Sequence, residues 1–256
     1  MRTPPPDGWQ GDAVTDAAAD ETPGASPARR LLAFLKGART VPRTRWTARR
    51  FWAPTPGSLI SLLVGLWLFG MGEAFLLTAD LGASPWTVLA QGLSRRTGLD
   101  IGWLTFAISA VVLLLWIPLR QKPGLGTLLN ILVIPIALQL TYDVLPEPGT
   151  WPARFALSLL GIATIGLGSG FYLTAGHGPG PRDGWMTGLH HRTGRPVGQI
   201  RLMIEVVVLV LGVALGGTFG IGTVLFALLI GQAVALGLQV VTHLAPPLPH
   251  EGLPHP

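Results

Sequence analysis

The chain alternates long apolar segments with short polar or glycine-rich stretches, and this pattern decides the fold class. Each apolar segment has about 19 to 23 residues, and at about 1.5 Å per residue a helix of that length crosses a hydrocarbon layer of roughly 30 Å. We therefore predict an all-α, polytopic membrane protein with six transmembrane helices. The predicted spans are residues 59–78, 101–119, 125–145, 153–175, 197–215 and 221–243.

Two polar stretches between the apolar segments resemble each other: GASPWTVLAQGLSRRTG (82–98) and GPGPRDGWMTGLHHRTG (178–194). The second begins 96 residues after the first. With that offset and no gap, residues 65–102 and 161–198 are identical at fifteen of 38 positions. The matches include Gly, Thr and Pro, which shared hydrophobicity does not produce. The pattern therefore indicates an internal duplication.

Each polar stretch predicts a short helix. Ser84 is expected to cap the first one, with Pro85 as its first residue and Gly98 as its C-terminal stop, and Pro181 and Gly194 take the same places in the second copy. A helix of about twelve residues covers about 18 Å, too little to cross the membrane. Each short helix is therefore expected to be re-entrant or interfacial.

If the short helices do not cross, each repeat has three crossings, and the odd number forces the two repeats into opposite orientations. This inverted arrangement explains why Arg95 and Arg96 face outward while Arg192 faces inward, although loops rich in Lys and Arg usually stay in the cytoplasm. If the short helices crossed, the chain would have eight passes and parallel repeats. Both arrangements fit the sequence, and we expect the inverted one.

The composition agrees with a membrane protein and narrows its chemistry. Of the 256 residues, 49% are hydrophobic and 12% are charged, and the mean hydropathy is +0.49. The absence of cysteine excludes disulfides, thiol nucleophiles and cysteine-bound metal sites. Eight of the 18 Lys and Arg residues lie between residues 29 and 50. We expect this segment to bind anionic lipid headgroups rather than nucleic acid, although a solvated basic linker has nearly the same pattern.

The charge distribution also divides the chain into segments. The basic segment is expected to hold the N-terminus in the cytoplasm, and no signal-peptide pattern precedes it. The expected segments are a disordered tail (1–28), a basic amphipathic cytoplasmic segment (29–57), repeat 1 (58–146), repeat 2 (153–244) and a disordered C-terminal tail (245–256).

The glycine-rich turns that lead into the short helices present free backbone N–H groups and partial positive charge. Broken helices of this kind hold anions or coupling ions in several transporters. We therefore hypothesise a solute site between the two turns; the alternative is that Gly and Pro only shape tight turns without a ligand. The candidate substrate-binding residues are Glu73, Gly82, Ser84, Pro85, His177, Gly178, Pro181 and Asp183.

Ionisable groups at membrane depth are costly, which makes them candidates for function. Glu73 lies two-thirds along the first span and has no local partner. Arg201 and Glu205 are spaced to pair on one helix face. His177 and Asp183 flank the second turn, where such residues more often shape the turn than bind a ligand.

Patterns typical of enzymes are missing. No GxSxG, HExxH, Walker or dinucleotide motif stands in a suitable context, and the adjacent His190 and His191 lack metal-ligand spacing. We expect no enzymatic activity, no cofactor and no metal. The expected function is transport or export of a small solute. The alternatives are a non-transporting scaffold or regulator of a partner enzyme, with residues 29–50 as its handle, and an intramembrane enzyme.

Four stretches, in the same order in both halves, resemble one known family: ADLGASPWTVLAQGLSRRTGLDIG, WIPLRQKPGLGTLLN, GPGPRDGWMTGLHHRTGRPVGQIR and GGTFGIGTVLFALLIG. Over residues 58–244 the chain resembles the YczE/YyaS/YitT family of bacterial integral membrane proteins. The resemblance implies a multi-pass protein of the bacterial cytoplasmic membrane and supplies no catalytic residues. Asp183 stands where the family often has an acidic residue, and Thr87 replaces it in the first copy.

Overall fold

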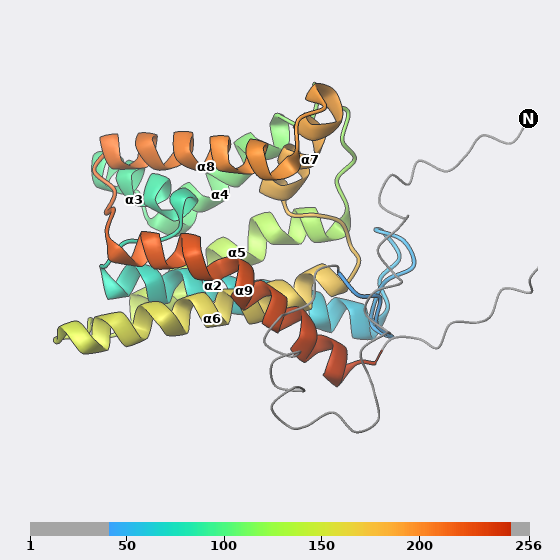
Figure 1. The fold of residues 1–256 in the computed structure, drawn as a ribbon, viewed down its shortest axis with the longest axis horizontal. Helices are drawn as coiled ribbons and strands as arrows, with labels where there is room; N and C mark the ends of the chain where they lie inside the picture. The colour runs from blue at the N-terminus through green and yellow to red at the C-terminus, as the bar shows by residue number, and fades with distance from the viewer. Residues whose placement is uncertain (1–40, 247–256) are drawn as a thin grey trace, which may run out of the picture.

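The structure is a computed structural model that describes residues 41–246. The predicted tail 1–28, the basic segment up to residue 40 and the C-terminal tail from residue 247 lie outside the described residues. Within 41–246 the chain forms eight helices and no β-strand, in agreement with the all-α prediction (Figure 1). They are α2 (Pro56–Ala79), α3 (Pro85–Thr97), α4 (Ile101–Leu114), α5 (Leu125–Val144), α6 (Trp151–Thr174), α7 (Pro181–Thr193), α8 (Val197–Ala214) and α9 (Ile221–Leu244).

Four helices of the described part are long and apolar enough to cross a membrane: α2, α5, α6 and α9. The pair α3 and α4, bent by 119° at their junction, makes a fifth if it counts as one broken span. The predicted number of six spans is therefore not confirmed. α4 ends at Leu114 instead of reaching residue 119, because Pro118 has no N–H to continue the helical hydrogen bonds.

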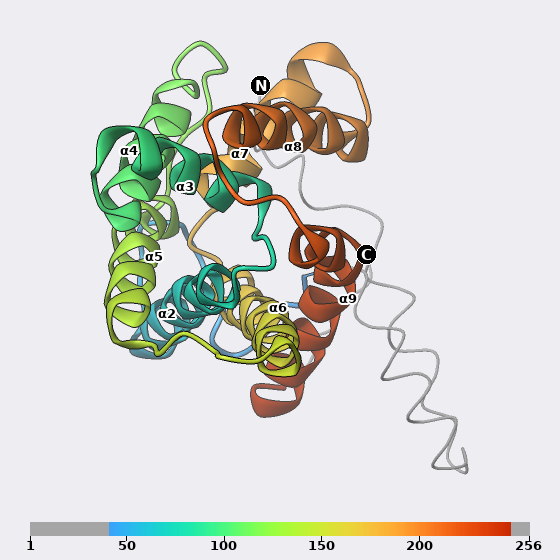
Figure 2. The same cartoon turned by 90° about the vertical axis from the view of Figure 1, so that its left-hand side faces the viewer.

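The helices lie in two layers (Figure 2). α2, α5, α6 and α9 form one layer, and α3, α4, α7 and α8 form the other. In the second layer α3 packs against α8, and α7 packs against α4, so each short helix contacts a helix from the other half of the chain. The two halves therefore do not fold as separate bundles.

α2 and α6 cross backbone to backbone at four glycines. A Cβ atom placed on Gly65 would lie 2.7 Å from the carbonyl oxygen of Gly168, and one on Gly72 would lie 2.7 Å from that of Gly161. Since the early glycine of α2 meets the late glycine of α6 and the reverse, the two helices run antiparallel. Small residues at such a crossing let helix backbones approach closely in a membrane.

The short helices are confirmed in length and in their ends. α3 and α7 have 13 residues each, which at about 1.5 Å per residue is too short to cross a bilayer. Gly98 and Gly194 end them in the left-handed conformation, with φ of 72° and 69°. The preceding turns contain Gly82 and Gly178 with φ of 100° and 97°, a region that side chains disfavour.

The glycine crossing makes a prediction for stability. Gly72→Ala places a methyl group against the Gly161 carbonyl and the Ile165 backbone, so we expect it to lower the free energy of unfolding by about 1–3 kcal/mol. Gly231→Ala in α9 is the matched control, because its new Cβ meets nothing within 4 Å. Thermal unfolding in detergent micelles compares the two; equal stabilities would contradict a tight crossing.

Candidate functional site

A buried carboxylate lies at the start of the first short helix. Glu73 of α2 is 2% exposed, and its carboxylate accepts hydrogen bonds from the hydroxyl groups of Ser84 and Thr87. Ser84 Oγ lies 2.9 Å from Glu73 Oε1, and Thr87 Oγ1 lies 2.7 Å from Glu73 Oε2. The chain has therefore turned back beside α2 within eleven residues, and Glu73 has partners that its own helix does not supply.

Ser84 is the N-cap residue of α3, as predicted, but its side chain makes no capping hydrogen bond. Its hydroxyl turns to Glu73 instead, because a hydrogen bond to a charged carboxylate is stronger than one to a neutral backbone group. Ser84 and Thr87 are the N-cap and third residues of α3, so the carboxylate sits at the positive end of that helix. The position that we expected to attract an anionic ligand thus already holds a carboxyl group of the protein itself.

The second short helix carries its own carboxylate. Asp183 is the third residue of α7, and its Oδ2 accepts a hydrogen bond of 2.9 Å from the hydroxyl group of Tyr172 in α6. At the offset of 96 residues Asp183 corresponds to Thr87, and Glu73 corresponds to Ser169, which bonds to the Ile165 carbonyl. Each short helix therefore has one acidic side chain at its beginning. For α3 this side chain is Glu73 of α2, whereas Asp183 belongs to α7 itself.

Arg182 interacts electrostatically with both carboxylates. Its guanidinium group is 5.0 Å from the ring centroid of Trp86, a cation–π contact. Burial lowers the pKa of this guanidinium from its ordinary value, while Glu73 and Asp183 act in the opposite direction. Among residues 41–246, no direct ion pair joins Arg182 to either carboxylate. Since Trp86 and Arg182 hold corresponding positions, their contact brings the beginnings of α3 and α7 face to face.

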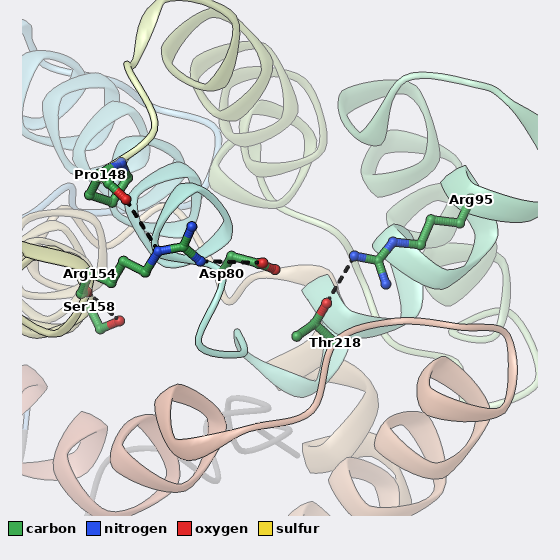
Figure 3. Close-up of polar contacts among 6 residues, drawn as sticks. All are labelled: Asp80, Arg95, Pro148, Arg154, Ser158 and Thr218. Carbon is green, nitrogen blue, oxygen red and sulfur yellow. Dashed lines mark hydrogen bonds and ion pairs between the residues drawn. The ribbon is translucent and has the colours of Figure 1, made fainter. Parts of the chain in front are cut away.

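Two ion pairs lie outside the Glu73 cluster, which consists of Glu73, Ser84, Trp86, Thr87, Tyr172, Arg182 and Asp183. Arg201 Nε and Glu205 Oε1 in α8 are 2.9 Å apart, as predicted from their spacing, and Glu205 also attracts Arg182. Asp80, at the end of α2, lies 3.6 Å from Arg154 of α6 (Figure 3). The second pair ties the first turn to the neighbouring long helix and leaves Asp80 out of the Glu73 cluster.

His177 and Gly178 lie apart from Glu73. The buried His177 ring contacts the Phe51 carbonyl oxygen at 3.1 Å and the Ser58 hydroxyl at 2.9 Å, and its own carbonyl accepts from Gly126 N. Gly178 packs against Gly124. These two predicted site residues therefore hold the second turn to the segment before α2 and to the start of α5.

The remaining predicted residues have structural contacts. Pro85 and Pro181 begin the short helices, as expected, and the Pro181 carbonyl accepts from Trp116 Nε1 at 2.8 Å. Gly82 packs against Gly220. The structure thus brings Glu73 together with Ser84, and Arg182 links them electrostatically to Asp183. The two glycine-rich turns stay separate.

Two cavities in the described part of the chain have volumes of about 380 and 440 Å³, and neither is lined by a predicted site residue. Within residues 41–246, no group of three or more His, Asp or Glu side chains is arranged to hold a metal ion. The Glu73 carboxylate is closed off in this structure, because Glu73, Ser84 and Thr87 are each 2% exposed. A ligand there would need the short helices to move.

Four members of the cluster were not among the residues predicted for the site: Trp86, Thr87, Arg182 and Tyr172. Thr87 was singled out only as the counterpart of an acid. One signal was available, because Trp86 and Arg182 differ strongly although their neighbours Pro85 and Pro181 match. A cation opposite an aromatic ring at corresponding positions is the pair expected where two related helices meet.

The Glu73–Ser84 contact is testable by a double-mutant cycle. Glu73→Gln and Ser84→Ala each remove the charge-assisted hydrogen bond, so together they should destabilise less than the sum of the single changes, with a coupling of about 1 kcal/mol or more. Denaturant unfolding in micelles measures it. The exposed Glu147→Gln paired with Ser84→Ala should be additive within about 0.5 kcal/mol; additivity in both pairs would contradict the contact.

Comparisons with known proteins show the family of this chain. Residues 57–238 match the family described as "Family of unknown function (DUF6198)". An uncharacterized protein of Haemophilus influenzae is 42% identical over 216 residues, which is 84% of this chain and 99% of that protein. No solved structure matches the chain.

Two relatives from Bacillus subtilis carry names. The uncharacterized membrane protein YczE is 33% identical to this chain, and the match covers 70% of this chain and 81% of YczE. The uncharacterized protein YyaS is 26% identical, and the match covers 70% of this chain and 90% of YyaS. The apolar helices and the YczE relative identify an integral membrane protein. With the family match extending over more than half of its length, the chain belongs to the YczE/YyaS-type family of membrane proteins.

Proposed function

We propose that the protein transports or exports a small solute and that the solute path passes the Glu73 cluster between the two short helices. The observation that carries this proposal is the burial of the Glu73 carboxylate in a membrane helix, held by two hydroxyl groups. An ionisable group at such a depth is expensive, and in membrane proteins it typically marks a transport path or a proton relay.

The arrangement favours a proton or a cation as the coupling ion at Glu73. The carboxylate already neutralises the positive end of α3, so an anion there would meet a like charge. Protonation, or a cation bound to the carboxylate, would weaken the hydrogen bonds from Ser84 and Thr87 and the attraction to Arg182. That would release α3 from α2, which is the movement that the closed cluster requires.

The proposal includes an inverted six-span architecture in the bacterial cytoplasmic membrane, with the N-terminus inside. Three observations support it: the antiparallel crossing of α2 and α6, the exchanged packing of α3 on α8 and α7 on α4, and the contact between Trp86 and Arg182. In this arrangement α8, and α4 together with the turn residues 115–120 that continue it, complete three crossings per repeat.

Cysteine labelling tests the orientation of the two short helices in the membrane. Because the chain has no native cysteine, only the introduced residue can react. Thr97→Cys and Thr193→Cys are exposed and hold corresponding positions at the ends of α3 and α7. We expect a membrane-impermeant maleimide added to intact cells to label Thr97→Cys and to leave Thr193→Cys unlabelled until the cells are opened. Labelling of both from the same side would contradict the inverted repeat.

Solute flux tests the function. Phosphatidylcholine and phosphatidylglycerol vesicles containing the protein are loaded with the small-molecule fraction of a bacterial extract, and released solutes are identified by mass spectrometry. Wild type should release at least one solute faster than protein-free vesicles, and Glu73→Gln should reduce that release to the protein-free level because the carboxylate is lost. Glu147→Gln, on the exposed α5–α6 loop, is the matched control and should retain it.

The scaffold alternative is also supported by an observation, because the end of the basic segment is anchored. Ala48 N donates to the Ala175 carbonyl at 2.9 Å, and Thr47 Oγ1 donates to that of Thr174 at 2.8 Å. Wild-type vesicles without release, together with loss of cellular function on deletion of residues 1–40, would favour a scaffold. Both the transport proposal and the scaffold alternative are compatible with binding of residues 29–50 to anionic lipid headgroups.

A further inference from the structure

The basic ends of the two short helices are used differently. At the end of α3, Arg95 donates to the Gly216 carbonyl and, at 2.9 Å, to the Thr218 hydroxyl (Figure 3), and Arg96 Nε donates to the Leu215 carbonyl at 3.1 Å. Both guanidinium groups are thus engaged by the α8–α9 connection. Their charge serves to hold α3 against that connection.

The basic groups at the corresponding end of α7 have fewer hydrogen-bond partners. Arg192 Nη1 donates to the Pro118 carbonyl at 3.2 Å, but within the described part of the chain neither Arg120 nor His191 donates a hydrogen bond from its side chain. These three basic residues lie around an open cavity of about 380 Å³. Its lining residues are Pro118, Leu119, Arg120, Gly188, His191 and Arg192.

The backbone of Arg120 adopts a conformation that is unfavourable for a residue with a side chain. Its φ is 53°, in the left-handed region, where a side chain costs roughly 1–2 kcal/mol. The corresponding residue in the second half is Gly216, with φ of 100°, which adopts this region freely. Glycine would therefore fit position 120 better, and the guanidinium group is the feature that distinguishes arginine there. Backbone strain of this kind is typical of binding sites.

We propose that this cavity binds a phosphate group, supplied by the headgroup of an anionic lipid. Arg120 and Arg192 provide planar guanidinium donors, which match phosphate oxygens, and His191 adds a ring N–H. Leu114 and Ile117, which precede the cavity-lining Pro118 in the chain, are 61% and 71% exposed. This apolar surface next to the basic cavity suits the acyl chains of a lipid, which a free phosphate ion does not need.

The place of the cavity agrees with this ligand. The α4–α5 connection and the end of α7 lie at the end of the bundle where residues 41–55 also lie (Figure 1). Arg43, Arg45, Arg49 and Arg50 stand in that segment, so this end of the protein is basic. An anionic membrane surface is the partner that such a concentration of charge attracts.

Native mass spectrometry of the full chain tests the proposal. Protein in neutral detergent is titrated separately with phosphatidylglycerol, phosphatidylcholine and inorganic phosphate. Wild type should retain phosphatidylglycerol in preference to phosphatidylcholine, and Arg120→Gly should bind it about tenfold more weakly, the loss expected of one charge-assisted hydrogen bond. Thermal unfolding without lipid should show Arg120→Gly to be at least as stable as wild type, because the left-handed backbone suits glycine.

Two controls separate the site from general charge. Arg195→Ala removes one exposed positive charge near the same end without touching the cavity, and it should bind like wild type. His191→Ala should weaken binding without changing the backbone at residue 120.

Displacement of the lipid by inorganic phosphate would identify the phosphate group as the bound part. Binding of inorganic phosphate without lipid retention would overturn the lipid assignment. Equal lipid binding by wild type and Arg120→Gly, or equal losses in Arg120→Gly and Arg195→Ala, would overturn the site.

Discussion

Because Gly65 and Gly72 lack side chains, α6 lies directly against the backbone of α2, and Gly161 and Gly168 allow the same approach from the other side. The rest of the packing depends on this contact. The two helices run antiparallel, so their C-terminal turns leave from opposite ends of the crossing. Each turn then leads a short helix back into the molecule, and the beginnings of α3 and α7 meet. A bulkier crossing would separate those beginnings.

The charges at this meeting point are stable only as a group. The Glu73 carboxylate has two hydroxyl donors and a helix N-terminus, and Asp183 has the Tyr172 hydroxyl. Arg182 attracts both acids without a direct ion pair. A buried charge with imperfect partners is costly, and removing one partner of such a group costs more than the contact itself contributes. The cluster therefore ties α3 to α2 through Glu73 and α7 to α6 through Asp183.

The two halves have the same order of long and short helices but differ in their charged and aromatic side chains. Glu73 corresponds to Ser169, Trp86 to Arg182 and Arg120 to Gly216. Conserving the helix ends and glycine contacts preserves the packing, because these depend on backbone shape. The side chains that differ lie at the meeting point of the short helices and at one basic end of the bundle. Both proposed sites, the cluster of charges and the open basic cavity, therefore lie where the two halves differ.

The sequence by itself determined the all-helical class, the two short helices and their glycine stops, because proline, glycine and apolar spacing act locally. It also showed the ionisable candidates, among them Glu73 and the Arg201–Glu205 pair. It did not show that Ser84 would turn to Glu73 or that Arg182 would lie over Trp86. Only the tertiary structure decided those contacts, because they join side chains from different helices, and a side chain's partner depends on which charges the packed helices bring within reach.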